Sequence, residues 1–531
     1  MAYHESAYFM MFLPVVLLCY QVAPKRMRWC VLLGFSYIFY FLFSRKLIVY
    51  LMAATVAAYA IGRILAYSKN KCRIACSAEG LTREEKKEIK GRFKKSEKRV
   101  VVFGICVLLG MLLALKYVGF FAENMNVLFA HIHVAWRLPV KQMLLPLGIS
   151  FYTMSAISYI VDVYWEKIEP EKNIGKFALF LGFFPIIMEG PICMYSDISD
   201  SLTNGASLKV ENLKNGAVRI MWGLLKKVVI ADRLYVIVTQ LFDNYQAYHG
   251  VMIAVAAVSY TVQLYMEFSG CMDIVIGSGE LFGVTLPENF EQPFVSKNAS
   301  EFWRRWHISL GRWFKTYIFY PVSMSGLVRR WKKYAKNHVG EYVTRIVASA
   351  MALFPVWICN GLWHGANWSY IFYGMYYFVI ILAELMLEPP VARLREALHI
   401  SETSKLWNLL RIAKTWCIIF IGELFFRADT LGIGMKMFRS MFRDFQISRL
   451  WDGTLLTLGL GRADMLVVVI GCLIVAVIGY FREKKVHVRE KISGFVLPAR
   501  WAVYIGLMLL VIIFGAYGPG YLEVDLIYAG F

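Results

Sequence analysis

The sequence contains few charged residues. Of its 531 residues, 18% are charged and 58% are hydrophobic, and the mean hydropathy is +0.52. An average soluble domain has about 25% charged and about 45–50% apolar residues, so this composition excludes a disordered chain and argues against a water-soluble enzyme. A membrane-spanning helix needs about 20 predominantly apolar residues, and apolar blocks recur along the whole sequence. The composition therefore predicts an all-α polytopic membrane protein.

The sequence also lacks features that would indicate other classes. It has no internal repeat and no low-complexity tract, which argues against a solenoid and against a duplicated transporter. No basic segment precedes the first apolar block at residues 7–24, so we expect no cleavable signal peptide. Cys72 and Cys76 have no second pair with which to form a zinc site, and the other eight cysteines lie in or beside apolar blocks. We predict neither a metal site nor a disulfide.

Acidic residues are fewer than basic ones. The chain has 37 Asp and Glu against 58 Lys and Arg, a net charge of +21. The basic residues cluster between apolar blocks, as in cytoplasmic loops, so we attribute the charge to orientation in the cell (plasma) membrane and expect no nucleic-acid partner. Residues 68–99 hold twelve Lys and Arg against five Glu, which predicts a basic cytoplasmic loop. Three spans precede this loop, so the N-terminus is expected outside.

Ionisable residues within the apolar blocks are candidates for function. We expect one membrane domain, residues 1–531, with ten to twelve spans plus re-entrant and interfacial helices. A charge at membrane depth costs about 2.5–3.5 kcal/mol or more on an exposed helix. The alternative for each such residue is a hydrogen bond between helices. The residues concerned are Asp162, Glu189, Glu267, Asp273, His364, Glu384 and Glu423.

The segment VWICNGLWHGANWSYIFYG, residues 356–374, is the strongest candidate. If it is helical, Asn360, His364 and Asn367 share one face, and Gly361 allows a neighbouring backbone to approach closely. Imidazole suits proton transfer near neutral pH, so His364 is a candidate catalytic base. The alternative is a structural histidine in a helix core.

A second candidate is SEFWRRWHISLGRWFKTYIFYP, residues 300–321. Asn298 followed by Glu301 resembles a capping box and predicts a helix start. Tryptophan at helical spacing among basic residues is typical of an interfacial amphipathic helix; the alternative is that the arginine pair binds the phosphate of an anionic donor. Residues 300–374 are the predicted catalytic core region. Besides His307, the candidates in residues 300–321 are Trp303, Arg304, Arg305 and Trp306.

A third segment, residues 260–290, places Gln263 and Glu267 on one helical face and is rich in glycine and serine. Such a stretch packs closely or bends. Glu267 and Asp273 are its candidate substrate-binding residues.

An ordered set of motifs along most of the chain resembles the membrane-bound O-acyltransferase superfamily. The similarity is greatest to the bacterial branch that includes the alginate O-acetylation membrane subunit. The motifs are LPLGISFYTMSAISYIVDVY (145–164), FFPIIMEGPICMYSDI (183–198), GLLKKVVIADRL (223–234), NFEQPFVSKNASEFWRRWHISLGRWFKTYIFYP (289–321), GLWHGANW (361–368), GELFFRADT (422–430) and GAYGPGY (515–521).

The resemblance implies a ring of tilted helices around a central funnel, in which an acyl donor and a hydroxyl acceptor meet from opposite sides. It implies that His364 and His307 are the catalytic pair. It also implies acyl transfer, most often acetyl, from a cytoplasmic thioester to an exported polysaccharide or to a partner acetyltransferase outside the membrane. The thioester, acetyl-coenzyme A or an acyl carrier protein, is a co-substrate, and we expect no tightly bound cofactor. The expected partners are membrane lipids, an acyl-donor protein and a glycan or cell-wall polymer.

Two alternatives stay open at this point. Within the family, D-alanyl transfer to teichoic acid from a carrier protein is the second possibility. Outside it, buried carboxylates could serve a transporter or flippase. The chain departs from the family pattern between Glu267 and Asp273, where DFSGYSD is frequent and this sequence reads EFSGCMD. That departure bears on the identity of the acceptor.

Overall fold

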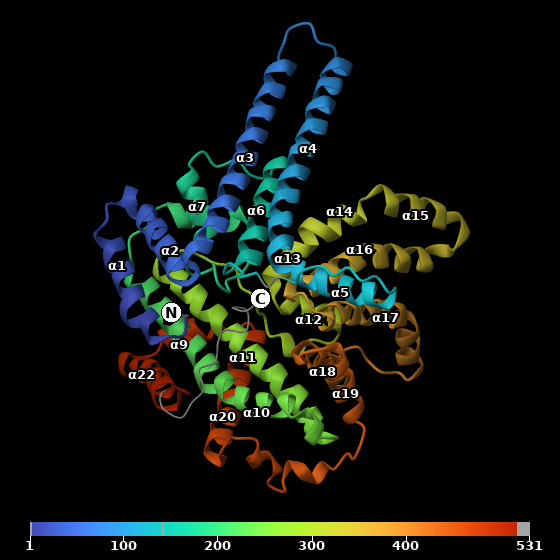
Figure 1. Cartoon of the computed structure of the whole chain (residues 1–531). Helices are drawn as coiled ribbons and strands as arrows, with labels where there is room; N and C mark the ends of the chain where they lie inside the picture. Colours follow the sequence, from blue (N-terminus) through green and yellow to red (C-terminus); the bar gives the residue numbers. More distant parts are fainter. Residues whose placement is uncertain (1–2, 141–142, 518–531) are drawn as a thin grey trace.

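The chain is built from helices. Figure 1 shows its computed structural model, which describes residues 3–140 and 143–517. Within these ranges there is no β-strand, and Phe290 and Trp306 form an isolated antiparallel bridge. Seven segments are long and apolar enough to cross a membrane, and one of them, Lys25–Cys76, contains two helices. The predicted all-α polytopic class is confirmed. The count of ten to twelve spans stays a prediction, and residues 518–521 of the GAYGPGY motif lie outside the described ranges.

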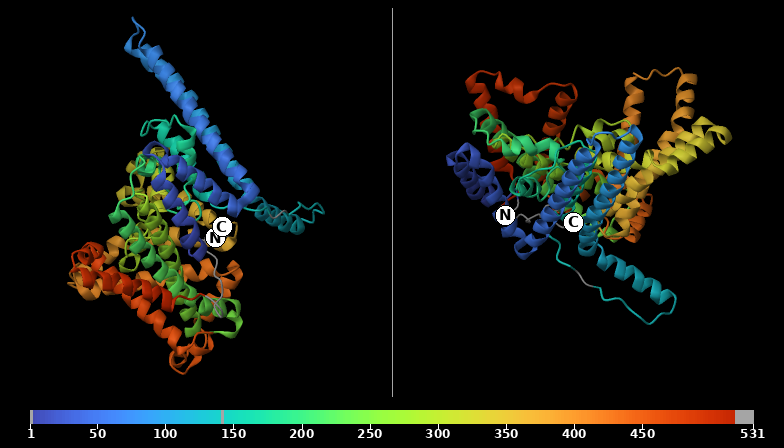
Figure 2. Two further views of the ribbon diagram at one scale, coloured as in Figure 1. Left: turned by 90° about the vertical axis from the view of Figure 1, so that its left-hand side faces the viewer. Right: turned by 90° about the horizontal axis from the view of Figure 1, so that it is seen from above.

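A helical hairpin projects from the body of the molecule (Figures 1 and 2). Its arms are α3 (Ile48–Cys76) and α4 (Arg83–Lys116), and they extend through most of the segment predicted to be a basic loop. The Thr82 hydroxyl accepts from Glu85 N (3.3 Å), and the Glu85 carboxylate accepts from Thr82 N (2.8 Å), so a capping box begins α4. Lysine, arginine and glutamate favour helices. The prediction of a loop over residues 68–99 is therefore wrong in conformation, and its cytoplasmic location stays a prediction.

The centre of the molecule contains helices that are buried nearly all round. In α6 (Ile149–Tyr164) every residue from Ile149 to Val163 is buried. Helix α11 (Val251–Leu281) packs against α9 (Val210–Leu224), α10 (Asp232–Asp243) and α18 (Lys405–Arg427). The buried positions of α6 and α11 are mainly apolar, with a few polar side chains among them.

Glycines determine how closely α9 and α11 approach each other. A Cβ atom on Gly223 would lie 2.5 Å from the carbonyl oxygen of Gly270, and one on Gly216 would lie 2.6 Å from that of Gly277. Real Cβ atoms do not approach backbone this closely, so neither position of α9 accepts a side chain without separating the helices. The close packing predicted for residues 260–290 is confirmed.

The C-terminal half contributes a second crossing. Helix α16 (Gly340–His364) packs against α17 (Trp368–Ala397). A Cβ atom on Gly361 would lie 2.4 Å from the Tyr370 carbonyl oxygen, and one on Gly374 would lie 2.2 Å from the Trp357 carbonyl oxygen. The close approach predicted for Gly361 is therefore confirmed. Two short helices, α12 (Ala299–Arg305) and α13 (Ile308–Phe314), precede this pair in the chain.

Peripheral helices expose apolar side chains, as helices in contact with lipid do. In α22 (Leu497–Phe514) Val511 is buried, whereas large apolar residues such as Leu509 and Ile513 are exposed. Helix α20 (Arg462–Glu483) has the same character. The remaining α-helices are α1 (Leu13–Val22), α2 (Arg28–Ser44), α5 (Val118–His131), α7 (Ile174–Gly182), α8 (Tyr195–Thr203), α14 (Tyr320–Ser323), α15 (Gly326–His338), α19 (Leu431–Ser440) and α21 (Val488–Ser493), and short 3-10 and π-helices lie between some of them.

Candidate active site

His364 is the last residue of α16. Gly365 follows with an extended backbone, and Asn367 begins α17 as its N-cap, its side chain accepting from Ser369 N (2.9 Å). The Asn367 amide also donates to the Asp429 carbonyl oxygen (2.9 Å). The predicted common face of Asn360, His364 and Asn367 is therefore wrong, because the helix ends between the last two. Asn360 is buried on α16, one turn before His364.

His307 also lies at a break between helices. It separates α12 from α13 and has a left-handed backbone, with φ of 48°. The predicted helix start is confirmed, since the Asn298 side chain accepts from Glu301 N (2.7 Å). The Glu301 carboxylate, however, accepts from Lys297 N (3.0 Å), not from Asn298 N. The expectation of one continuous amphipathic helix over 300–321 is wrong, because the chain turns at His307.

One tryptophan brings the two histidines together. The Trp363 ring centroid lies 5.4 Å from that of His307 and 4.9 Å from that of His364. Both imidazoles are buried, 2% and 4% exposed. On their other sides, the His307 ring meets Phe268 at 4.9 Å and the His364 ring meets Phe426 at 4.9 Å, both edge to face. The residues are 57 positions apart in sequence, yet they share one aromatic enclosure.

Asn289 fixes the tautomer of His307. The Asn289 side-chain oxygen accepts from Ser309 N (3.0 Å) and from the Ser309 hydroxyl (2.9 Å), and it lies 3.2 Å from His307 Nδ1. Because an amide oxygen only accepts, Nδ1 carries the proton and Nε2 is the accepting nitrogen of a neutral imidazole. His307 lies outside the seven candidate spans, and its burial lowers the pKa to about 3. It is therefore neutral at physiological pH.

The surroundings of His364 include a buried carboxyl group. The Tyr373 ring lies 5.9 Å from the His364 ring, and the Tyr373 hydroxyl donates to Glu423 Oε1 (2.7 Å). Glu423 is 1% exposed on α18. This bond joins α17 to α18. It matches the alternative prediction for the buried carboxylates, a hydrogen bond between helices. Glu423 thus supports the wall of the site through Tyr373.

A cavity of about 350 Å³ adjoins the His364 enclosure. Phe426 and Tyr370 line it, and their rings lie 4.9 and 6.3 Å from the His364 ring. Gln263 also lines it: this side chain is 2% exposed, and its Oε1 atom accepts no hydrogen bond from the described residues. The remaining polar lining is rich in groups that bind hydroxyls: Asn367, Arg427, Asp429, Tyr235 and Tyr260.

A much smaller polar cavity lies further along α11. Its volume is about 20 Å³, and Ser269, Asp273 and Asn289 line it. Because a helix rises about 1.5 Å per residue, Gln263 and Asp273 lie about 15 Å apart along α11. Phe268, which contacts His307, is between them in sequence. Along α11, one cavity thus lies on each side of the aromatic enclosure that the two histidines share.

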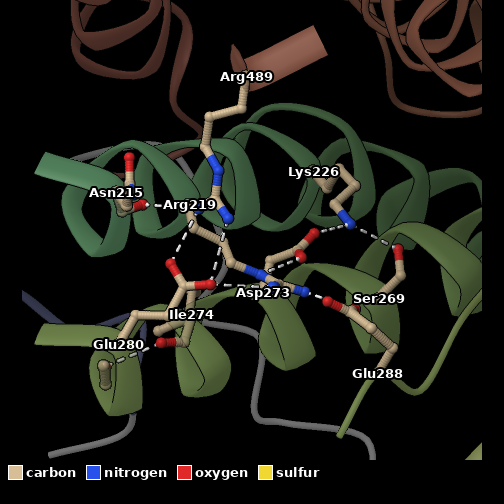
Figure 3. A network of polar contacts seen from close by, with 10 residues as sticks. Asn215, Arg219, Lys226, Ser269, Asp273, Ile274, Glu280, Glu288 and Arg489 are labelled. Carbon is tan, nitrogen blue, oxygen red and sulfur yellow. Dashed lines mark hydrogen bonds and ion pairs between the residues drawn. The ribbon is translucent and has the colours of Figure 1, made fainter. Parts of the chain in front are cut away.

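The two predicted carboxylates of α11 are ion-paired. Figure 3 shows Asp273 accepting from Arg219 Nε (3.0 Å) and Lys226 Nζ (2.5 Å), while Arg219 also pairs with Glu280 (3.3 Å) and Glu288 (2.6 Å). Glu267 lies 3.4 Å from Lys227 Nζ. These pairs tie α11 to the segment Val210–Ala231. Their contacts link helices, and Asp273 also lines the small cavity together with Asn289.

The aromatic and basic residues of α12 and its C-cap, Trp306, divide into two groups. Trp303 packs against Trp357 and Tyr377, with ring centroids 5.1 and 4.8 Å away, and Trp306 is buried in the bridge with Phe290. Arg305 pairs with Glu301 (3.0 Å) and Glu483 (2.7 Å), so its charge is already compensated. Arg304 is exposed and has no carboxylate partner among the described residues. The two arginines therefore differ in environment: the charge of Arg305 is compensated by carboxylates, and that of Arg304 is exposed.

Sequence patterns did not single out Asn289 or Lys116 as site residues. Asn289 is the first residue of the motif 289–321, but an isolated asparagine gives no signal of its own. Lys116 lies within the predicted apolar block of residues 100–122 but is not among the candidate residues; its amino group donates to the carbonyl oxygen of Trp363 (2.7 Å), the residue before His364. Gln263 was recognised as sharing a face with Glu267, yet its contact with the cavity depends on how α17 and α18 pack around it.

Comparison with known proteins adds to this geometry. Residues 171–426 match the family model described as MBOAT, membrane-bound O-acyltransferase family. The probable alginate O-acetylase AlgI of Pseudomonas syringae pv. tomato is 31% identical, over 85% of this chain and 77% of its own. The peptidoglycan O-acetyltransferase of Helicobacter pylori is 28% identical, over 64% of each chain. The teichoic acid D-alanyltransferase of Bacillus subtilis is 29% identical, over 44% of this chain and 58% of its own.

Proposed function

Because the chain belongs to the membrane-bound O-acyltransferase family, we propose that it transfers an acetyl group from a cytoplasmic thioester to hydroxyls of an exported polysaccharide or cell-wall polymer. The names of the O-acetylase relatives support acetyl as the group and such polymers as the acceptors. The observation that carries the proposal is a pair of buried histidines on one tryptophan, beside a cavity with a hydroxyl-binding lining. The expected location is the plasma membrane, with the N-terminus outside.

His364 acts as the general base in this proposal. Its imidazole takes the proton of the acceptor hydroxyl as the oxygen attacks the thioester carbonyl carbon. The carbon–sulfur bond then breaks, and the imidazolium returns the proton to the departing thiolate. Such a group contributes roughly 10²–10⁴ in rate. Asn360, buried one turn before His364, is the preferred oxyanion donor, a role worth about 2.7–4 kcal/mol for one donor, because the Asn367 side chain already caps α17.

His307 assists as a neutral imidazole. Its Nδ1 proton is directed at Asn289, so its Nε2 atom accepts hydrogen bonds and does not donate them. A neutral accepting group beside Trp363 suits orientation of the acceptor hydroxyl or of His364. The Asn289 contact supports this positioning role.

The larger cavity is assigned to the acceptor. Amide, guanidinium, carboxylate and phenol groups line it, a mixture that suits sugar hydroxyls. The donor is expected to be acetyl-coenzyme A or an acyl carrier protein. Arg304 is exposed and has no carboxylate partner within the described part of the chain, so its charge is available to bind a phosphate of the donor, whereas Arg305 is ion-paired. A partner acetyltransferase outside the membrane is a further expectation.

D-alanyl transfer to teichoic acid is the second candidate. The similarity to the Bacillus subtilis D-alanyltransferase favours it, although that match covers 44% of this chain against 85% for the alginate relative. A transporter or flippase is disfavoured, since the buried carboxylates Glu267 and Asp273 are both held in ion pairs with lysines.

The transfer assay tests the proposal directly. The purified full-length protein, in nanodiscs, receives radiolabelled acetyl-coenzyme A and polysaccharide from the same cells after mild alkaline removal of its esters. Wild type is expected to place label on the polymer, and His364→Ala is expected to lose at least about 10²-fold in rate while eluting as the same monodisperse species. Label transfer by His364→Ala at the wild-type rate would remove His364 from the mechanism.

A further inference from the structure

We propose that Lys116 and Tyr117 are positioning residues for His364. Lys116 is the last residue of α4, and Tyr117 follows it. The Lys116 amino group donates to the Trp363 carbonyl oxygen (2.7 Å), and the Tyr117 hydroxyl donates to the Leu362 carbonyl oxygen. Both acceptors belong to the final turn of α16, immediately before the candidate base. The inference rests on the proposed role of His364 and adds the residues that hold it.

The final turn of α16 needs partners from outside the helix. The last four carbonyl groups of an α-helix have no intrahelical donor. Gly365 N supplies one donor, to Leu362 O at 3.2 Å, and the extended backbone of Gly365 then leads away from the helix. Two of these terminal carbonyls are therefore bound by side chains of the α4 end. Without those bonds the turn that carries His364 is free to fray.

The Trp363 carbonyl is the critical acceptor. It belongs to the peptide plane that joins Trp363 to His364, so the Lys116 bond fixes the plane from which both rings extend. The Trp363 ring in turn separates the two imidazoles by defined distances. A change in that plane would move both the base and the ring that places it against His307.

The environment of Lys116 indicates a role other than an ion pair. Within residues 3–140 and 143–517, no carboxylate lies in salt-bridge range of its amino group. Its other polar contact is Ser150 Oγ, at 3.5 Å, near the start of α6. The C-terminal end of a helix carries partial negative charge, which favours a donating amino group there. Tyr117 beside it is 7% exposed. The two shorter hydrogen bonds of this pair, from Lys116 and Tyr117, are thus made to the end of the helix that carries His364.

This arrangement predicts a loss in turnover more than in binding. The acceptor cavity does not include Lys116 or Tyr117, so substrate affinity should be preserved. A displacement of about 1 Å at a reacting group costs roughly 10²-fold in rate. We expect Lys116→Met to lower kcat at least about tenfold with KM within about threefold of wild type. Lys116→Arg should recover most of the rate, because guanidinium also donates to the carbonyl.

A matched control is available on α3. Lys69 Nζ donates to the Val163 carbonyl oxygen (2.5 Å) in the last turn of α6, a bond of the same kind at the far end of that helix from Ser150. Lys69→Met should keep wild-type kcat. Tyr117→Phe should lower kcat less than Lys116→Met, since Leu362 O retains its bond from Gly365 N. Transfer is measured with acetyl-coenzyme A and the de-esterified polymer, using monodisperse protein.

A second measurement does not depend on transfer. Diethyl pyrocarbonate modifies imidazole, and mass spectrometry of the intact full-length protein's peptides gives the modification rate of His364. We expect that rate to rise several-fold in Lys116→Met and to stay at the wild-type value in Lys69→Met and Lys116→Arg. An unchanged rate together with an unchanged kcat in Lys116→Met would overturn the inference. Absence of transfer by wild type would instead contradict the proposed function. In that case the modification rate of His364 would still decide whether Lys116 positions it.

Discussion

At the scale of single residues, the two histidines occupy different chemical settings. His307 is fixed by a side-chain amide whose oxygen serves three donors, and His364 stands at a helix end among aromatic rings. A hydrogen bond to one ring nitrogen sets the tautomer and orientation of a functional imidazole. The structure therefore supports unequal roles, a base at His364 and a fixed neutral partner at His307.

Asn289→Ala tests the fixed partner. The change leaves the Nδ1 proton of His307 and both donors of Ser309 without their shared acceptor, and His307 is released to rotate. We expect transfer to fall about 10–100-fold, as for loss of an orienting contact, whereas Asn289→Asp, which keeps an accepting oxygen, should retain more activity.

The same variants test the neutral state of His307. Its pKa of about 3 lies below the usual value near 6.5 because burial disfavours the cation. His307 therefore gains no proton between about pH 5 and pH 9, and the midpoint of the pH–rate profile should be the same in Asn289→Ala, which introduces no charge beside the ring, and wild type. A shifted midpoint would show that His307 titrates in the working range.

Part of this site could be predicted from the sequence. His364, His307 and the helix start at Asn298 follow from motifs and local capping patterns. Lys116 could not be found, because it lies more than two hundred residues from His364 and meets it only through tertiary packing. The common face of Asn360 and Asn367 failed for a local reason, since an extended Gly365 and an N-cap at Asn367 interrupt the helical period.

At the scale of elements, close helix crossings hold the site in place. Helix α11 carries Gln263 in the larger cavity and Phe268 against His307, and its position depends on contact between its glycines and those of α9. Glycine-rich interfaces of this kind allow two backbones to approach closely in a membrane. The sequence shows that α11 is rich in small residues, but it does not show which helix packs against them.

Substitution of two helical glycines tests this crossing. Gly223→Ala places a Cβ atom 2.5 Å from the Gly270 carbonyl oxygen, whereas a Cβ atom on Gly34, in α2, meets nothing within 4 Å. We expect Gly223→Ala to destabilise the protein by about 1–3 kcal/mol through overpacking and to lower Tm. Gly34→Ala should leave Tm unchanged or raise it, because alanine is favoured in helices by up to about 1 kcal/mol. Equal Tm values in detergent would contradict the account of the crossing.

At the scale of the whole molecule, one chain combines lipid-facing helices with a buried centre. The apolar excess in the composition predicted the membrane class, which is confirmed, whereas the catalytic region that the family motifs indicate stays a prediction. The basic segment 68–99 was assigned correctly as strongly polar but wrongly as a loop. Its lysines and arginines extend α3 and α4 into a projecting hairpin (Figure 1). The distribution of charged residues indicates on which side of a membrane a segment lies, but it does not show whether that segment is a loop or a polar helix.

The α4 helix links that projection to the candidate active site. It runs 34 residues, about 51 Å at the usual helical rise, from Arg83 in the hairpin to Lys116 beside the end of α16. The active region is thus assembled from segments distributed over most of the chain: the end of α4, the centre of α11, the break at His307 and the helix pair α16 and α17.

The most direct test of the central claim is the ester content of exported polymers in cells. A deletion strain is complemented with wild type or with His364→Ala at matched membrane levels, and mass spectrometry quantifies acetyl and D-alanyl esters on secreted and wall polysaccharides. We predict that acetyl esters disappear in the deletion, return with wild type and stay absent with His364→Ala, while D-alanyl esters do not change. Acetyl esters restored by His364→Ala, or a loss confined to D-alanyl esters, would contradict the account.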